Sequence, residues 1–213
     1  MFVEDIKRLY EIRKEEIGKR LSNFRKLFEK ANDERIFAEL VFCILTPQSK
    51  AKICWKAVEN LMKKNLLIHG SYEQVLKELK GIRFKKRKAK YIVEARKTFT
   101  RGNKICIKDV ISSFSDPKEI REWLVENIKG MGYKEASHFL RNIGLGGDLS
   151  ILDRHILKNL RLLGVIEDIP KTLTKKKYIE VEDKMRRFSK KIGIPLSHLD
   201  LLLWSKETGE IFK

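Results

Sequence analysis

Cysteines and long apolar runs are both scarce in this sequence of 213 residues. Its three cysteines, Cys43, Cys54 and Cys106, form no CxxC pair, which is typical of buried thiols in a reducing compartment. No apolar run approaches the ~20 residues of a membrane-spanning helix. The segment Met1–Tyr10 already carries acidic and basic residues where a signal peptide would be apolar. We therefore expect a cytoplasmic protein with no membrane partner.

Acidic residues are few beside the basic ones. The chain has 29 Asp and Glu against 47 Lys and Arg, which gives a formal net charge of +18. A solvated Lys/Glu-rich surface of the kind found in heat-stable proteins explains many charges, but it does not explain their imbalance. The excess of positive charge favours nucleic acid as the partner.

Alternating strand patterns are nearly absent, whereas helical patterns follow one another along the chain. Residues 3–29 have apolar positions at helical spacing, and the stretch from Ile36 to Leu45 is apolar almost all round, which indicates a helix in the centre of the core. Ser197 and Asp200 have the spacing of a capping box that opens the last helix. The sequence predicts an all-α protein.

The most informative stretch is 116–155. Asp116 and Pro117 have the pattern of a helix start, and Gly130 and Gly132 break that helix, since glycine takes positive φ without steric cost. A second helix begins at once. Backbone N–H groups of such a turn, and of the following first helical turn, are expected to face outwards, where they suit a phosphate.

This stretch carries a resemblance. IKGMGYKEA at 128–136, followed by LDRH at 152–155, resembles the helix-hairpin-helix and Asp motif of the endonuclease III superfamily of DNA glycosylases. The pattern KEASHFLR at 134–141 with DRHIL at 153–157 is similar to the 8-oxoguanine DNA glycosylase/lyases first known from archaea. The similarity extends over most of the chain.

The resemblance implies a helix-hairpin-helix glycosylase fold with two helical subdomains. A central barrel-like subdomain would span 40–132, and a second would combine 1–39 with 133–213, with DNA entering the cleft between them. The implied function is that of a monomeric, bifunctional repair enzyme. It would flip 8-oxoguanine out of double-stranded DNA, excise it, and nick the strand by β-elimination. No cofactor is implied, and no cysteine after Cys106 could hold the iron–sulfur cluster that some relatives carry.

Two residues would carry the chemistry by this resemblance. Lys134, just after the glycine turn, would attack C1′ of the nucleotide and form an imine. A free lysine is almost fully protonated at neutral pH, so its place at the positive end of a helix and its burial would have to favour the neutral amine. Asp153 would cap the next helix and stabilise the positive charge that develops on the sugar. Lys129 is a nearby rival that we expect to contact DNA only.

Two loop residues are candidates for insertion into the DNA. Gln48 corresponds in position to a glutamine that fills the gap left by a flipped base in endonuclease III relatives; the alternative is an ordinary polar loop residue. Phe84 stands in a basic run and could recognise the base region as a wedge, or it could anchor that run in the core.

The hairpin and the helix after it supply further expected contacts. The residues assigned to DNA binding are Lys129, Gly130, Gly132, Tyr133, Arg154 and His155. Backbone carbonyls of Ile128 and Met131 are a candidate site for a monovalent cation, as in relatives; we expect no other metal.

The end of the chain is expected to recognise the base. By the resemblance, Trp204 stacks on the flipped base and Lys213 reaches into the pocket, with Ile211 and Phe212 anchoring the tail. The competing interpretation is a core tryptophan and a frayed terminus. Two other functions stay open: a glycosylase for oxidised pyrimidines, and a non-catalytic helix-hairpin-helix DNA-binding module.

Overall fold

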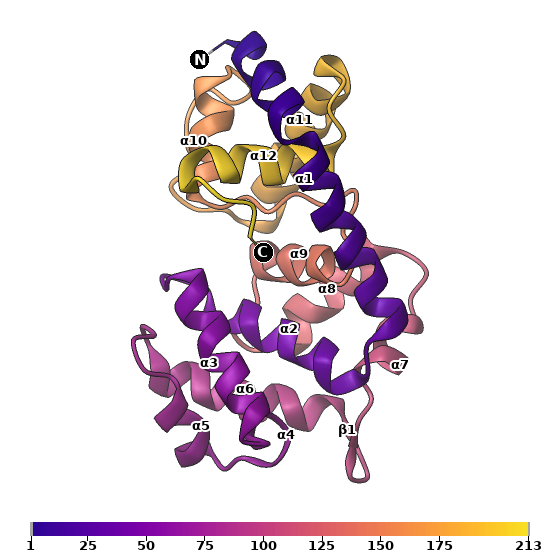
Figure 1. Cartoon of the computed structure of the whole chain (residues 1–213), viewed down its shortest axis with the longest axis vertical. Helices are drawn as coiled ribbons and strands as arrows, with labels where there is room; N and C mark the ends of the chain where they lie inside the picture. Colours follow the sequence, from indigo (N-terminus) through magenta and orange to yellow (C-terminus); the bar gives the residue numbers. More distant parts are fainter. Residues whose placement is uncertain (1, 213) are drawn as a thin grey trace.

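The computed structural model describes residues 2–212, which form twelve helices and one small sheet (Figure 1). The helices are α1 (Val3–Lys30), α2 (Asp33–Leu45), α3 (Ala51–Lys63), α4 (Leu66–His69), α5 (Tyr72–Glu78), α6 (Lys85–Phe99), α7 (Ile107–Ser112), α8 (Pro117–Asn127), α9 (Tyr133–Asn142), α10 (Arg154–Leu162), α11 (Lys175–Ile192) and α12 (Leu196–Thr208). Strands β1 (Thr100–Arg101) and β2 (Lys104–Ile105) pair antiparallel, with Thr100 opposite Ile105. The all-α prediction is confirmed, because two strands of two residues are only a hairpin between helices.

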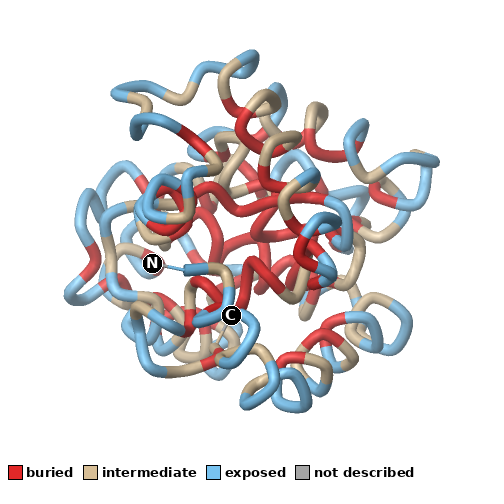
Figure 2. The backbone as a smooth tube through the Cα atoms, turned by 90° about the horizontal axis from the view of Figure 1, so that it is seen from above, coloured by how far each residue is buried: buried red, intermediate tan, exposed pale blue. Residues whose placement is uncertain are grey.

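Apolar side chains gather in two clusters. The first extends from Ile36 to Leu149 in the sequence and is centred on α2, whose residues from Ile36 to Leu45 are all buried, as the sequence predicts. The second combines α1 with α10, α11 and α12. Figure 2 shows the buried backbone gathered in the interior, with the exposed segments around it.

Helices α1 and α9 connect the two clusters. Ile17 and Phe24 of α1 belong to the second cluster, whereas Phe28, one turn further on, packs against the first. In Figure 1, α1 runs along both groups of helices and α9 lies between them. Phe139 of α9 is buried in the first cluster, while Tyr133 at its start packs against the second. The helix that carries Lys134 therefore lies at the junction.

Helix α12 begins differently from the prediction. Pro195 is its N-cap residue, with no side-chain hydrogen bond, so the capping box predicted from Ser197 and Asp200 is wrong. The reason is that Asp200 is only 2% exposed and accepts a hydrogen bond from Arg141 of α9 at 2.9 Å. Leaving the buried Arg141 guanidinium without its carboxylate would cost more free energy than leaving a solvated helix end without a cap.

Among residues 2–212, no helix combines the length and the apolar character that a bilayer crossing requires.

Candidate active site

The turn between α8 and α9 leaves no space for a side chain at Gly130. Gly130 has φ +87°, and a Cβ atom there would lie 2.4 Å from Cδ2 of Tyr91, so only glycine fits. Asp116 accepts a hydrogen bond from the Lys118 N–H at 2.8 Å, which confirms the predicted start of α8. Lys134 then falls in the first turn of α9, also as predicted.

Glu135 occupies the turn that was expected to face phosphate. Its Oε2 accepts the Gly132 N–H at 3.2 Å, and its Oε1 lies 3.1 Å from Nζ of Lys134. The Met131 N–H donates to the carbonyl of Ile128 at 3.2 Å. The expectation of open N–H donors is therefore wrong for Met131 and Gly132, because the protein satisfies both. Glu135 instead fixes the Lys134 ammonium against the turn, with that side chain 24% exposed.

Asp153 is the N-cap of α10. Its Oδ1 accepts hydrogen bonds from the backbone N–H groups of His155 at 2.8 Å and Ile156 at 2.9 Å, which confirms the predicted cap. Two donors on one oxygen fix the direction of the carboxylate.

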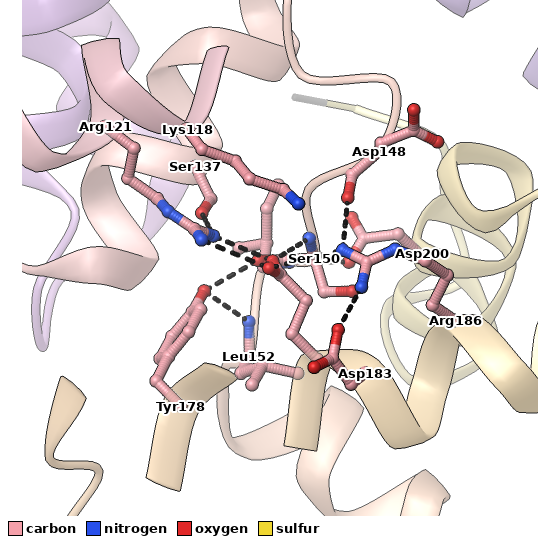
Figure 3. Close-up of polar contacts among 12 residues, drawn as sticks. Lys118, Arg121, Ser137, Asp148, Ser150, Leu152, Tyr178, Asp183, Arg186 and Asp200 are labelled. Carbon is pink, nitrogen blue, oxygen red and sulfur yellow. Dashed lines mark hydrogen bonds and ion pairs between the residues drawn. The ribbon is translucent and has the colours of Figure 1, made fainter. Parts of the chain in front are cut away.

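The segment before Asp153, residues 148–153, is tied down by buried polar side chains, and we refer to it as the strap. The Ser150 N–H donates to Oε2 of Glu182 at 2.8 Å. Arg121 donates two hydrogen bonds to the same carboxylate, at 2.8 and 3.1 Å, and a third to Ser137 of α9 at 3.2 Å. Arg121 and Glu182 are both almost inaccessible. Figure 3 shows Arg121, Ser137 and Ser150 converging on this point.

A second buried pair fastens the strap one residue further along. Arg141 of α9 pairs with Asp200 of α12 at 2.9 Å, and Asp200 accepts the Ile151 N–H at 3.1 Å. Burial raises the pKa of Asp200 to about 6, partly offset by Arg141. The strap that ends at Asp153 is thus bonded to α9, the helix of Lys134, through this ion pair.

Tyr178 completes the fastening. Its hydroxyl donates to the carbonyl of Ser150 at 2.6 Å and accepts the Leu152 N–H at 3.2 Å (Figure 3). Burial raises the pKa of this phenol above its ordinary value, so it stays neutral and can keep both bonds.

Sequence reasoning missed these buried polar groups. A signal did exist for Glu182, which falls on the same helical face as the buried Tyr178, Val181 and Met185, where a carboxylate requires a partner. The identity of that partner, Arg121, could not be read from the sequence.

Gln48 and Phe84 lie on two exposed loops. Both have left-handed backbone conformations, with φ of +54° and +58°, which side chains rarely adopt. Phe84 is 52% exposed, so the core-anchor interpretation of this residue is wrong and the ring is available to a partner. The guanidinium of Arg83 lies 5.4 Å from its centroid.

The last helix and the tail meet both clusters. Trp204 is partly exposed and packs against the second cluster, so it is not a fully buried core residue. Ile211 is buried in the second cluster, and the ring of Phe212 contacts that of Phe42 in the first, edge to face at 6.5 Å. The predicted anchoring of the tail is confirmed, and Figure 1 shows the tail after α12 running from the upper group of helices towards the lower one. Lys213 lies outside the described residues.

The remaining predicted contact residues differ in their accessibility. The side chain of Lys129 is 70% exposed, with Glu94 at 3.4 Å. Arg154 is exposed at the start of α10, and its Nε lies 3.3 Å from Nε2 of His155. The hydroxyl of Tyr133, by contrast, donates to Glu122, so its side chain faces the protein.

A lysine and an aspartate at the starts of consecutive helices, behind a glycine hairpin in a strongly basic chain, define a helix-hairpin-helix enzyme for DNA. No cluster of histidine, cysteine, aspartate or glutamate that could hold a metal occurs in the part of the chain described, residues 2–212.

Comparisons with known proteins agree with this class of enzyme and identify one family within it. The profile of the family described as 8-oxoguanine DNA glycosylase (Ogg-HhH) matches residues 17–194. The 8-oxoguanine DNA glycosylase/AP lyase of Fusobacterium nucleatum is 47% identical over 212 residues, which cover 100% of this chain and 98% of the relative. The chain therefore belongs to the 8-oxoguanine DNA glycosylase family.

Solved structures show the same fold. The 8-oxoguanine DNA glycosylase of Thermotoga maritima superposes with a TM-score of 0.88 at 35% identity, over 99% of this chain and 98% of that one. The Methanocaldococcus jannaschii 8-oxoguanine glycosylase/lyase, crystallised with a 15-mer DNA containing 8-oxoguanine, has a TM-score of 0.87 at 39% identity, over 98% and 99% of the two chains.

Proposed function

We propose that this protein is a bifunctional DNA glycosylase/AP lyase that excises 8-oxoguanine from double-stranded DNA. The observation that carries the proposal is the placement of Lys134 in the first turn of α9 and of Asp153 at the N-cap of α10. Buried ion pairs bond the strap between these helices to α9. Relatives with this name align over nearly the whole chain.

Lys134 is the nucleophile in this proposal. Its neutral amine forms a bond to C1′ as the bond from C1′ to the base breaks, and the base leaves with the electron pair. Loss of a proton from nitrogen and opening of the sugar ring give the imine. Removal of a C2′ proton then expels the 3′ phosphate, so the strand is nicked. Asp153 stabilises the positive charge on the sugar in the first step.

The base is recognised at the end of the chain. We assign stacking on the flipped base to Trp204, which is partly exposed and packs against the second cluster. We assign base recognition also to Lys213, which follows Phe212 in the sequence; the ring of Phe212 contacts that of Phe42 in α2. The carboxylate of Lys213 would accept the N7–H that 8-oxoguanine has and guanine lacks. Phe84 enters the duplex from its exposed loop.

The DNA lies, in this proposal, in a cleft between a subdomain of residues 40–132 and one of 1–39 with 133–213. Gly130, Gly132 and the exposed Lys129 contact its backbone, together with Arg154 and His155. One copy of the chain is sufficient, and the chemistry requires no cofactor or iron–sulfur cluster. The protein acts where the chromosome is, in the cytoplasm.

Borohydride trapping tests the proposal, since it reduces the imine to a stable protein–DNA adduct. We expect wild-type protein to be trapped on 8-oxoguanine duplexes, and Lys134→Gln to lose both base release and trapping while it keeps its DNA affinity. Lys129→Gln is the matched control, because it removes an exposed amine five residues away and should be trapped normally. Trapping of Lys134→Gln, with loss in Lys129→Gln, would exchange their roles.

The same assay separates the alternatives. Binding without any adduct would identify a non-catalytic DNA-binding module. Trapping on duplexes with oxidised pyrimidines, and none with 8-oxoguanine, would identify the other glycosylase.

The role of the terminus has its own test. Deletion of Lys213, or a C-terminal tag, should sharply reduce 8-oxoguanine excision, because the carboxylate no longer reaches the base. Nicking of a preformed abasic site should fall much less, since no base is recognised there. Gel-based rates on the two substrates measure this, and equal loss of both activities, or of neither, would contradict the recognition role.

A further inference from the structure

Lys88 is a buried cation that the chemistry proposed above does not use. It lies in the first turn of α6 and is only 4% exposed. Its ammonium donates to the carbonyls of Leu45 at 2.7 Å and Pro47 at 2.6 Å, and to Oγ of Ser49 at 3.2 Å. All three donors are therefore used, and all three acceptors belong to the end of α2 and the loop that follows it.

This arrangement is costly for folding. No carboxylate within the described residues 2–212 forms an ion pair with Lys88, so its direct partners are all neutral oxygens, and Glu135 favours its charge only from a longer distance. Burial lowers the pKa of this lysine, and the nearby Lys134 lowers it further. An apolar side chain of similar size would avoid the desolvation of a charge at this position. We therefore look for the reason for this buried cation in the segments that its hydrogen bonds connect.

Lys88 holds two loops in one arrangement. Oγ of Ser49, which accepts from Lys88, also accepts the backbone N–H of Arg83 at 3.1 Å. Gln48 precedes Ser49, and Phe84 follows Arg83. Both Gln48 and Phe84 have left-handed backbone conformations, which persist in residues other than glycine only where surrounding contacts hold them. Ser49 and Lys88 thus join the loop of Gln48 to the loop of Phe84.

We propose that Lys88 is a positioning residue for base extrusion. It fixes the spacing between Gln48 and Phe84, so that the two side chains enter the duplex as a rigid pair, one into the gap and one beside the orphaned base. This inference rests on the proposed function. It adds a requirement at the extrusion step, before Lys134 reacts.

Lys88→Met tests the proposal, because it keeps most of the length of the side chain, one atom short of lysine, and removes the ammonium. Lys90→Met is the matched control: it lies on the same helix, and its side chain is 70% exposed. We expect Lys88→Met to lower single-turnover excision of 8-oxoguanine about 10- to 100-fold, the scale on which misplaced groups act. Nicking of a preformed abasic site should stay near the wild-type rate, since no base has to be extruded.

A spectroscopic measurement reports on the extrusion step directly. With 2-aminopurine opposite the lesion, wild-type protein should raise the fluorescence as the orphaned base loses its stacking partners. Lys88→Met should show a smaller or slower rise, and Lys90→Met a normal one. Rates are normalised to the folded fraction from a thermal melt, so a general loss of stability is separated from a loss of positioning.

Two more variants make the outcome decisive if Lys88→Met folds poorly. Lys88→Arg keeps the charge and should recover most of the fluorescence rise, whereas Ser49→Ala, which breaks the link between the loops, should reproduce the defect in part. Parallel loss of excision and nicking, or a fluorescence rise equal to that of Lys90→Met, would overturn the inference. Failure of the proposed function would appear differently, as the absence of borohydride trapping in the wild-type protein.

Discussion

In the proposed function, Asp153 serves the fold and the reaction with different oxygens of one carboxylate. Both backbone hydrogen bonds end on Oδ1. We therefore assign the other oxygen, Oδ2, to the positive charge that develops on the sugar. One carboxylate also has two uses beside Lys134: Glu135 forms an ion pair with Lys134 and accepts the Gly132 N–H. In both cases a group at the same helix end fixes the orientation of the side chain.

Asp153→Asn separates the two uses. The amide oxygen can still cap α10, so the melting temperature should stay close to that of the wild type. Base release should slow by ~10² or more, because a charge in the transition state loses its fixed partner. Single-turnover excision assays measure the rate. Asp153→Ala is the complementary variant, which also loses the cap and about 1 kcal/mol of stability. A wild-type excision rate in Asp153→Asn would rule out the electrostatic role.

At the scale of elements, the sequence predicted what depends on neighbours in the chain. The cap at Asp116, the turn at Gly130 and the fully buried α2 all follow from residues within a few positions, and all are confirmed. The failures depend on distant partners. Arg121 pairs with Glu182 across 61 positions, and Arg141 pairs with Asp200 across 59. No local pattern encodes such a pair, and for Asp200 the local pattern of a cap was misleading.

The candidate site shows the same difference between features that local sequence predicts and features that depend on distant residues. Lys134 and Asp153 fall at the helix starts that their motif predicts, but the strap that bonds the two helices together was not predictable. The open donors expected at the glycine turn fail for a related reason. Glu135 is adjacent in the sequence, yet its choice between solvent and the turn is decided by three-dimensional packing.

The contact between α10 and α12 should depend on pH. Glu207 of α12 accepts hydrogen bonds from Lys158 at 2.8 Å and Asn159 at 3.1 Å, both on α10. Lys158, then Asn159 and Lys206, lower the pKa of this carboxyl from 4.5 to about 2. A carboxyl with a lowered pKa in the folded state stabilises the fold fully above pH 4.5, and this contribution disappears as the pH falls through about 2.

Glu207→Gln tests this contact. The variant should unfold more easily than the wild type near neutral pH, by the order of 1 kcal/mol expected for pairs near the surface. The difference should shrink steadily as the pH is lowered. Denaturant titrations at several pH values measure it. A difference that is constant with pH would show that Glu207 contributes through packing and not through charge.

At the scale of the whole molecule, the segments that join the two apolar clusters include α1, α9, the strap and the tail. Helix α9 carries Lys134, and the tail carries Phe212, whose ring contacts that of Phe42. Helix α1 is structural and contacts both clusters along its length. In the proposed function, DNA binds at this junction, where α9 carries Lys134.

The net charge of +18 predicts a steep dependence of DNA affinity on salt, because lysines and arginines release counterions from the phosphates they contact. Fluorescence anisotropy at several salt concentrations should give a clearly negative slope of log affinity against log salt. Lys129→Gln should reduce that slope by about 1 if it removes one phosphate contact. A slope near zero in the wild-type protein would exclude an interface dominated by phosphates.

The two buried ion pairs that fasten the strap have a consequence for heat. Arg121 with Glu182, and Arg141 with Asp200, hold the segment that ends at Asp153. The penalty for removing charges from water falls as temperature rises, whereas apolar burial gains little more. The relative contribution of these ion pairs to the stability of the strap therefore increases when the protein is warmed. On heating, the attachment of the strap, which ends at Asp153, to α9, the helix of Lys134, should be among the last features of the candidate site to be lost.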